Sequence, residues 1–211
     1  MTSRVPAIFD VQDPCSPLSI PNSQTALLLL DYQNLSIAAM GDAGAKAVAT
    51  AGLMQKWAFD SGIMVVHCLV DTKSGESPKP SMKAAGRVKV LQEKLQNMPA
   101  LGDEHEGLSK IAEDEKTDAR RLGYISALEG PRIREMLDGV KSLILGGIST
   151  SGCLLSTCRA ATDAEYIVTV VEDACADPVP GLHDMLMQHV ISSTAHVCKC
   201  AELIEIWKSK A

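Results

Sequence analysis

The sequence lacks the surplus of positive charge that is typical of proteins that bind nucleic acids or anionic membranes. Its 20 Lys and Arg residues are outnumbered by 26 Asp and Glu residues, which gives a net charge of −6 at pH 7. It also lacks a long apolar run, and residues 1–24 contain Asp10, Asp13 and four prolines where a signal peptide needs an unbroken apolar segment. We therefore expect neither nucleic acid nor a membrane as a partner.

Closely spaced cysteine pairs of the CxxC type are also absent, although the chain has seven cysteines. An odd number of cysteines in a chain without a signal peptide indicates reduced thiols rather than a disulfide framework. We therefore predict a cytoplasmic protein in which most of these cysteines are buried as small apolar residues.

The composition is otherwise that of an ordinary globular protein. Hydrophobic residues make up 46% of the 211 residues and charged residues 22%, so the chain can form a sizeable core. We predict a single domain over residues 25–211, preceded by an N-terminal extension, residues 1–24.

Four continuous apolar runs are typical of strands that are buried on both faces of a parallel sheet. These runs are residues 26–30, 63–70, 143–145 and 167–171. Helices are predicted at residues 43–61, 131–138, 150–164, 180–189 and 201–208, with a short strand at 195–198. The alternation predicts an α/β fold with a Rossmann-like, doubly wound, mostly parallel sheet and helices on both faces.

Two segments, residues 72–82 and 98–118, do not fit this alternation. Long loops at strand ends can close over a binding site, and charge-rich loops can equally be solvated connectors. The sequence leaves both readings open.

The carboxyl ends of the strands form the usual ligand-binding edge of such a sheet. Three of the four apolar runs end in acidic residues, at Asp31, at Asp71 and at Glu172-Asp173. Asp71 and Asp173 fit ordinary turn or helix-cap positions. Asp31 follows four leucines directly and precedes Tyr-Gln-Asn, so we predict that its carboxylate is aimed at a site.

A glycine-rich turn joins the third predicted strand to the next helix, with the sequence Gly-Gly-Ile-Ser-Thr-Ser-Gly-Cys at residues 146–153. It places Cys153 near the first turn of the helix, where unpaired amides and the positive helix end favour a thiolate and can hold an oxyanion. Cys158 lies deeper in the helix and on a different face, so we interpret it as a core residue. Cys153 is therefore the candidate nucleophile.

A metal site is not indicated. His196, Cys198 and Cys200 alternate along the chain, but a structural zinc needs a fourth ligand and loop-borne spacing. We interpret these residues as part of a terminal strand and predict neither a metal nor another cofactor.

Four blocks of sequence follow one another in a distinctive order. They are an apolar strand with Asp-x-Gln-Asn at residues 31–34, Gly-Ile-Ser-Thr-Ser-Gly-Cys-Leu-Leu-Ser-Thr at 147–157, Arg-Ala-Ala-x-Asp-Ala-x-Tyr at 159–166, and Val-Glu-Asp-Ala-Cys-Ala-Asp at 171–177. In these blocks the chain resembles the isochorismatase-like cysteine hydrolase family. The resemblance runs in order from about residue 25 to residue 207.

The resemblance implies a Rossmann-like sheet and an Asp-Lys-Cys triad, in which Asp31 and Cys153 take the first and last places. It also implies an oxyanion hole made by the amides of Ser149 and Cys153. A non-proline cis peptide between Ile148 and Ser149 is implied as well.

The lysine of that triad has no match in this chain. Family members place it shortly before a segment that resembles residues 125–128, where this chain has Arg-Arg-Leu-Gly-Tyr at residues 120–124. We predict Arg121 as the substitute, because arginine keeps the positive charge that supports a thiolate and a carboxylate. Arg120 and Lys116 are alternatives that the sequence leaves open.

These residues together predict a hydrolase that acts on a small molecule. In the favoured hypothesis Asp31 takes the proton of Cys153, which attacks an amide or another C–N bond and forms a thioester. Gln33 and Tyr124 are predicted to contact the substrate. Two alternatives stay open: enol-ether hydrolysis by Asp31, as in isochorismatases, and a binding homologue that lost activity with the lysine.

A homo-oligomer is also expected, because members of the family usually associate. The predicted helix at residues 201–208 presents Leu203, Ile206 and Trp207 on one apolar side, which another copy could cover. Packing of this side within the same chain is the alternative.

Overall fold

The computed structural model describes residues 9–75, 83 and 85–210 of the chain. Of the predicted loop at residues 72–82, residues 76–82 lie outside this range. Part of the predicted N-terminal extension packs on the domain: Leu18 is buried, and Asn22 Oδ1 accepts a hydrogen bond from Trp207 Nε1 at 3.0 Å.

Six parallel strands form a sheet in the order β3-β2-β1-β4-β5-β6. The strands are β1 (Thr25–Leu30), β2 (Met64–Asp71), β3 (Lys116–Arg121), β4 (Ser142–Gly147), β5 (Ile167–Val171) and β6 (His196–Cys198). This is the predicted Rossmann-like α/β fold, which is thereby confirmed. The strand order reverses between β1 and β4, and the crevice at the carboxyl ends of two such strands is where ligands bind in open α/β sheets.

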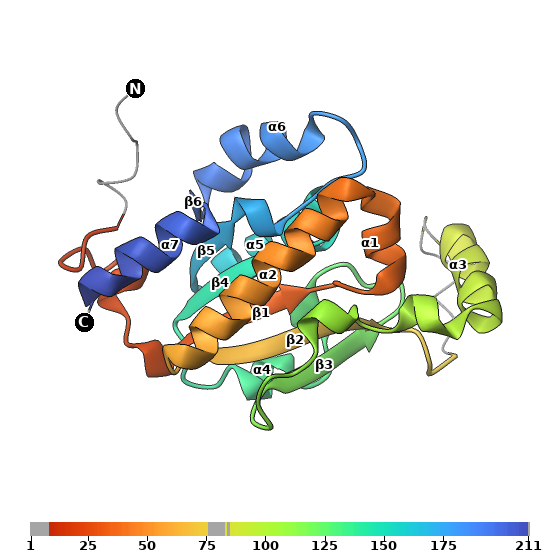
Figure 1. The fold of residues 1–211 in the computed structure, drawn as a ribbon, viewed down its shortest axis with the longest axis horizontal. Helices are drawn as coiled ribbons and strands as arrows, with labels where there is room; N and C mark the ends of the chain where they lie inside the picture. Colours follow the sequence, from red (N-terminus) through yellow and green to blue (C-terminus); the bar gives the residue numbers. More distant parts are fainter. Residues whose placement is uncertain (1–8, 76–82, 84, 211) are drawn as a thin grey trace.

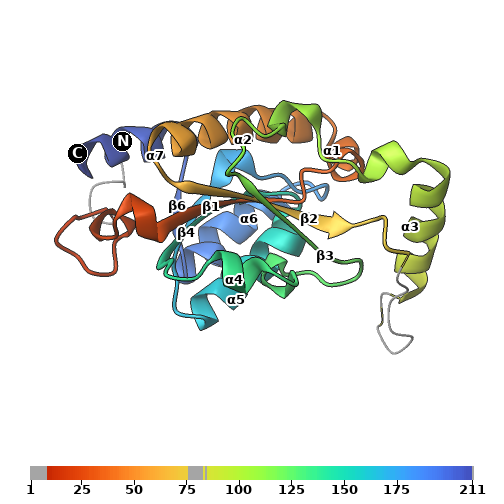
Figure 2. The same ribbon diagram turned by 90° about the horizontal axis from the view of Figure 1, so that it is seen from below.

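Helices cover both faces of the sheet (Figure 1). The α-helices of the described residues are α1 (Asn34–Met40), α2 (Asp42–Asp60), α3 (Ala85–Asn97), α4 (Ile133–Met136), α5 (Leu155–Asp163), α6 (Leu182–His189) and α7 (Cys200–Trp207). Figure 2 shows α1, α2 and α7 on one side of the strands and α4, α5 and α6 on the other, with α3 beyond the carboxyl end of β2. None of the helices in the described part of the chain has the length and apolar character that a membrane crossing requires.

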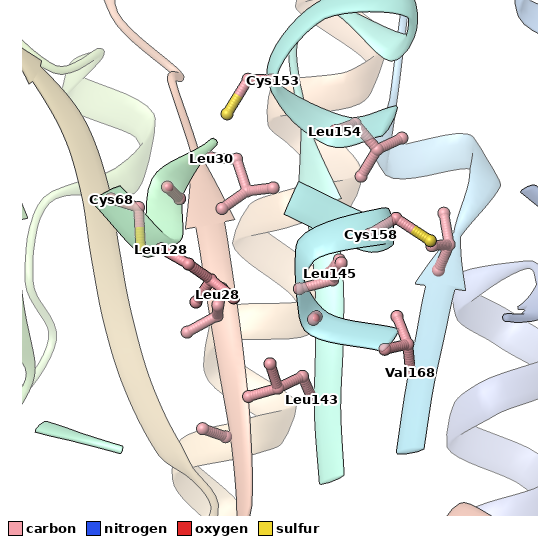
Figure 3. Packing of buried hydrophobic residues seen from close by; sticks show 14 of the residues in the cluster. Leu28, Leu30, Cys68, Leu128, Leu143, Leu145, Cys153, Leu154, Cys158 and Val168 are labelled. Carbon is pink, nitrogen blue, oxygen red and sulfur yellow. The ribbon is translucent and has the colours of Figure 1, made fainter. Parts of the chain in front are cut away.

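β1 is buried along its whole length because helices cover both of its faces. Leu27 and Leu29 pack with residues of α2 and α7, whereas Leu28 and Leu30 pack with residues of α4, α5 and α6. Cys158 belongs to the second of these clusters and has no exposed surface (Figure 3). The continuous apolar run is therefore a central strand, as predicted, and Cys158 is a core residue.

Three elements are not predicted by the sequence pattern, namely α1, α3 and β3. The strand β3 reads Lys-Thr-Asp-Ala-Arg-Arg and forms one edge of the sheet, where one side of a strand has no partner and charged residues are common. The only apolar side chain of β3 is that of Ala119, so the strand has no apolar run that would distinguish it from the charged residues before it. The first three residues of β3 therefore fall inside the predicted loop at residues 98–118.

The apolar side of α7 packs within its own chain. Leu203 and Trp207 are buried, and the rings of Trp57 and Trp207 meet edge to face with their centroids 5.4 Å apart. This helix face therefore gives no support to an association of copies. The homo-oligomer, like the cytoplasmic location, stays a prediction.

Gly147 at the end of β4 provides a test of the close packing of β1 against β4. A Cβ atom on Gly147 would lie 2.5 Å from Leu30 Cβ and 2.9 Å from the Leu30 carbonyl oxygen. We expect Gly147→Ala to lower the free energy of unfolding by about 1–3 kcal/mol, because the strand pair must move apart. Urea denaturation measures this loss.

Gly86 in α3 offers a matched control, since no atom lies within 4 Å of a Cβ added there. Gly86→Ala is expected to raise the free energy of unfolding by about 0.5–1 kcal/mol. Equal stability of the two variants would contradict the packing described for β1 and β4.

Candidate active site

Asp31 directly follows β1, at the point where the strand order reverses. Its backbone φ is +56°, in the left-handed region that residues other than glycine rarely adopt. Its amide donates a hydrogen bond to the Cys68 carbonyl at 2.9 Å. The next residue, Tyr32, is fully buried, and its hydroxyl donates to the Ala174 carbonyl. The turn that carries the Asp31 carboxylate is thus held on both sides.

The Asp31 carboxylate and the Arg120 guanidinium form a buried ion pair with two parallel hydrogen bonds. Arg120 Nη1 lies 2.6 Å from Asp31 Oδ1, and Nη2 lies 2.6 Å from Oδ2. Arg120 Nε also donates to the Tyr124 carbonyl at 3.0 Å, so the guanidinium is fixed at both ends. Burial alone would lower the pKa of Arg120, but the hydrogen bond with Asp31 and the nearby negative groups raise it. The group therefore stays positively charged.

The cation beside Asp31 is Arg120 and not Arg121, which corrects the choice made from the sequence. Arg120 is paired with Val70 in the register of β2 and β3, and Arg121 with Asp71. Because successive side chains of a strand point to opposite faces, only one of the two arginines can face Asp31. Lys116 lies at the far end of β3, where its Nζ donates to the Met136 carbonyl at 3.3 Å. The signal that separates these candidates is the two-residue alternation of β3, a strand that the sequence pattern hides.

Cys153 lies in a π-helical turn (Thr150–Leu154) that precedes α5. In Figure 3 its side chain points toward the end of β1, whereas that of Cys158 points toward β5. The peptide bond between Ile148 and Ser149, just before this turn, is cis, as the family resemblance implies.

The Cys153 thiol is buried, and its surroundings favour the protonated form. Burial is the largest cause that raises its pKa, followed by the charge of Asp31, while Arg120 and a hydrogen bond with Thr157 act in the opposite direction. The surroundings of Cys153 therefore do not support the expected thiolate: burial and the charge of Asp31 outweigh the charge of Arg120 and the hydrogen bond with Thr157.

Thr157 is a site residue that the sequence reasoning missed. Its Oγ1 accepts a hydrogen bond from the Ala127 amide at 2.9 Å and lies 3.7 Å from Cys153 Sγ. Since the hydroxyl already accepts from an amide, its own proton can point at the sulfur. Thr157 stands four residues after Cys153 on the same helical face, which is the signal that could have identified it.

The backbone amides of the turn that carries Cys153 are largely occupied. Four of them donate within the fold: Thr150 to the Ala176 carbonyl at 2.9 Å, Ser151 to Asp177 Oδ2 at 2.7 Å, and Gly152 and Leu154 to the Ser149 carbonyl at 3.2 Å each. The amides of Ser149 and Cys153, which the family resemblance assigns to an oxyanion hole, are not among these four.

Gln33 and Tyr124, the two predicted substrate contacts, both take part in the framework of the site. The Gln33 amide nitrogen donates to the carbonyls of Val70 at 3.0 Å and Gly102 at 2.6 Å, and its oxygen accepts from the Val70 amide at 2.9 Å. Its side-chain amide therefore ties the end of β2 to the loop before β3, a role that the sequence does not indicate. Tyr124 holds Arg120 through its carbonyl, and its side chain is 37% exposed.

A small cavity lies next to this framework, with a volume of about 70 Å³. Gln33, Val70 and Leu122 line it together with leucines of α1, α3 and the loop at residues 99–102. Gln33 follows Asp31 by two residues, and Leu122 follows Arg120 by two, so the cavity borders the segments that carry the ion pair.

The three residues weighed as metal ligands lie apart from the ion pair. His196 Nε2 is 3.1 Å from the Cys15 carbonyl oxygen. Cys198 and Cys200 are buried, and the amide of Cys200 donates to Asp173 Oδ1 at 2.8 Å. They anchor β6 and the start of α7.

Comparison with known families fits this fold and site geometry. The model of the isochorismatase domain matches residues 25–202. The chain therefore belongs to the isochorismatase family, a family of hydrolases. No protein with a curated description matches it.

Solved structures share the fold at low sequence identity. A cysteine hydrolase from Pseudomonas syringae pv. phaseolicola superposes with a TM-score of 0.70 at 18% identity, over 91% of this chain and 96% of that one. An isochorismatase family protein from Desulfovibrio vulgaris gives 0.70 at 19% identity, over 88% and 98% of the two chains. The MAR1 ribonuclease from Caenorhabditis elegans gives 0.63 at 18% identity, over 89% and 83%. Proteins with different activities thus share this fold, and the reaction has to be argued from the site.

The buried ion pair can be tested by a double-mutant cycle. We expect Arg120→Met to lower the free energy of unfolding by about 3–5 kcal/mol, because it leaves the Asp31 carboxylate buried without a partner. Adding Asp31→Asn to this variant should recover part of the loss, since the orphaned charge is then removed. Additive effects of the two substitutions, measured by urea denaturation, would show that the two side chains do not interact.

Proposed function

We propose that this protein hydrolyses an amide or another C–N bond of a small molecule through a thioester on Cys153. The observation that carries the proposal is the buried Asp31 carboxylate, which lies close enough to Cys153 for its charge to raise the pKa of the thiol and which Arg120 holds through two hydrogen bonds. A nucleophile, a base and a group that orients the base are the parts that covalent catalysis requires.

In the first half of the reaction the Cys153 sulfur attacks the carbonyl carbon of the substrate. Its proton passes to Asp31, so that no free thiolate has to persist in the buried site. The sulfur–carbon bond forms, the carbon–nitrogen bond breaks, and the leaving amine takes the proton from Asp31. The raised pKa of Cys153 agrees with a nucleophile that loses its proton only as it attacks.

The oxygen of the attacked carbonyl becomes negative during this step. We assign its stabilisation to the amides of Ser149 and Cys153, as the family resemblance implies. Amides that are fixed before the reaction stabilise the developing charge without reorganising.

In the second half a water molecule attacks the thioester. Asp31 accepts one proton of this water, the sulfur–carbon bond breaks, and the acid is released while the sulfur regains a proton. Asp31 thus serves as base, acid, base and acid again at one position, and it is ready for the next cycle once the sulfur has its proton back.

Arg120 differs from the lysine of the family triad in a way that affects the mechanism. Arginine does not lose its proton in proteins, and its planar fork binds both carboxylate oxygens. Arg120 therefore provides a fixed positive charge that orients Asp31 and offsets negative charge on sulfur, but it does not carry protons. We infer that all proton transfers pass through Asp31.

The proposal is tested with a panel of small amides in an assay of amine or ammonia release. Cys153→Ala is expected to lower kcat at least about 1,000-fold, because no thioester can form. Asp31→Asn is expected to do the same, since an amide cannot accept the thiol proton. In the wild type, mass spectrometry after acid quenching should detect the acyl group on Cys153.

Cys158→Ala is the control variant, because Cys158 is a buried cysteine of the same segment that points away from the site. It should keep the thioester and most of the turnover. Full amide turnover by Cys153→Ala would refute the proposal. Pyruvate release from isochorismate that survives Cys153→Ser but not Asp31→Asn would favour enol-ether hydrolysis instead.

A further inference from the structure

A second buried charged cluster lies on the face of the sheet opposite to Cys153. Its centre is His67 in β2, which has no exposed surface. Nδ1 of His67 lies 2.8 Å from Glu104 Oε1, and Nε2 lies 3.1 Å from Glu115 Oε2. The histidine thus joins two carboxylates that come from the long segment between α3 and β3.

The geometry of this cluster defines the charge of the histidine. Each ring nitrogen faces a carboxylate oxygen, and only the imidazolium form can donate a hydrogen bond from both nitrogens. Burial alone would lower the pKa of His67, but the hydrogen bonds and charges of Glu104 and Glu115 outweigh it and raise the pKa above its usual value of 6.5.

The elements packed around His67 add little further charge. β1 and β3 present Leu29 and Thr117 at the paired positions, and Gln55 of α2 donates to both oxygens of Glu115, at 3.0 and 3.3 Å. The ammonium group of Lys110 donates to the Glu115 carbonyl at 2.7 Å. Glu115 therefore has partners besides His67.

Glu104 sits on the segment that covers the residues after Asp31. It forms an antiparallel bridge with Gln33. On either side of this bridge, the His105 amide donates to the Tyr32 carbonyl at 2.9 Å, and the Asn34 amide donates to the Asp103 carbonyl at 3.0 Å. The Glu104 side chain is 18% exposed, compared with 3% for Glu115, so Glu104 is the partner that can detach into solvent.

We propose that protonated His67 is a positioning residue for the reaction: by holding Glu104 it keeps the 102–105 segment on residues 32–34 and thereby fixes the direction of Asp31. The inference rests on the proposed function of Asp31. When His67 loses its proton, one ring nitrogen turns a lone pair toward a carboxylate, Glu104 is released, and the backbone pairing beside Asp31 loosens.

The sign of the pH dependence follows from the raised pKa of His67. A histidine that binds its proton more tightly in the folded state stabilises the fold at pH values below about 6.5, and this contribution is lost as pH rises through the folded-state pKa. We therefore expect the segment to loosen, and kcat to fall, on the alkaline side of pH 6.5.

Glu104→Gln tests the proposal, with Glu106→Gln as the matched control on the same segment. Both variants remove one carboxylate, but Glu106 is exposed and is not among the groups that shift the pKa of His67. In Glu104→Gln, hydrogen exchange at the amides of Asn34 and His105 should be about tenfold faster at neutral pH. The NMR titration of the His67 ring should also move to lower pH.

The enzymatic readout is the pH profile of kcat. In Glu104→Gln its alkaline limb should move to lower pH, and kcat should fall roughly tenfold with little change in KM, because the position of the base and not substrate binding is affected. Glu106→Gln should match the wild type in all of these measurements. In His67→Gln, whose side chain cannot become charged, the alkaline limb of kcat should disappear. The amides of Asn34 and His105 should then exchange rapidly at every pH.

Unchanged exchange at Asn34 and His105 in Glu104→Gln, or an unmoved alkaline limb, would overturn the proposal. Its failure can be told apart from failure of the proposed function. If Cys153→Ala loses turnover and the alkaline limb of Glu104→Gln stays where it is in the wild type, only the role of His67 is refuted. If Cys153→Ala stays active, the proposed function is refuted, and the exchange and NMR measurements still decide whether His67 holds the segment.

Discussion

The ion pair between Asp31 and Arg120 is the interaction on which the rest of the site depends. Both side chains are almost fully buried, and buried charges are tolerated only when they are paired with good geometry. The pair connects β1 with β3, which lie on either side of β2. It therefore forms only when all three strands are in register, and the site is a property of the sheet rather than of any one loop.

The buried position of this pair also shapes the chemistry around it. Cys153 lies in the same apolar cluster as Leu28 and Leu30, and burial there raises the pKa of its thiol. In the proposed reaction Asp31 takes the thiol proton, because each carboxylate oxygen has more than one lone pair, which leaves room for the thiol beside the guanidinium. Arg120 contributes a charge that does not move, and the cluster of His67 with Glu104 and Glu115 lies on the opposite face of the sheet. Both clusters hold the short segment that carries the base.

Sequence patterns predict the central strands and the edge strand β6, but they miss the other edge strand, β3. The central strands are continuous apolar runs because both of their faces are covered, and such runs are visible without any structure. The edge strand β3 has polar residues on an open side, so it resembles a charged loop. This single omission explains the choice of Arg121 over Arg120, since the alternation of side chains is known only once the strand is known. The roles of Gln33 and Thr157 were also not predicted. The partners of Gln33 lie far away in the sequence, and Thr157 meets Cys153 across one helical turn.

The sequence by itself determined the Rossmann-like fold, the candidate nucleophile Cys153 and the candidate base Asp31, since each depends on local patterns: apolar runs, a glycine-rich turn and an acidic residue at a strand end. The tertiary structure alone decided which cation meets Asp31, that burial raises the pKa of the Cys153 thiol, and that His67 joins two glutamates. These three features depend on distances between segments far apart in the chain and on burial. Both are set when the strands pair and the helices cover the sheet, and neither can be read from the order of the residues.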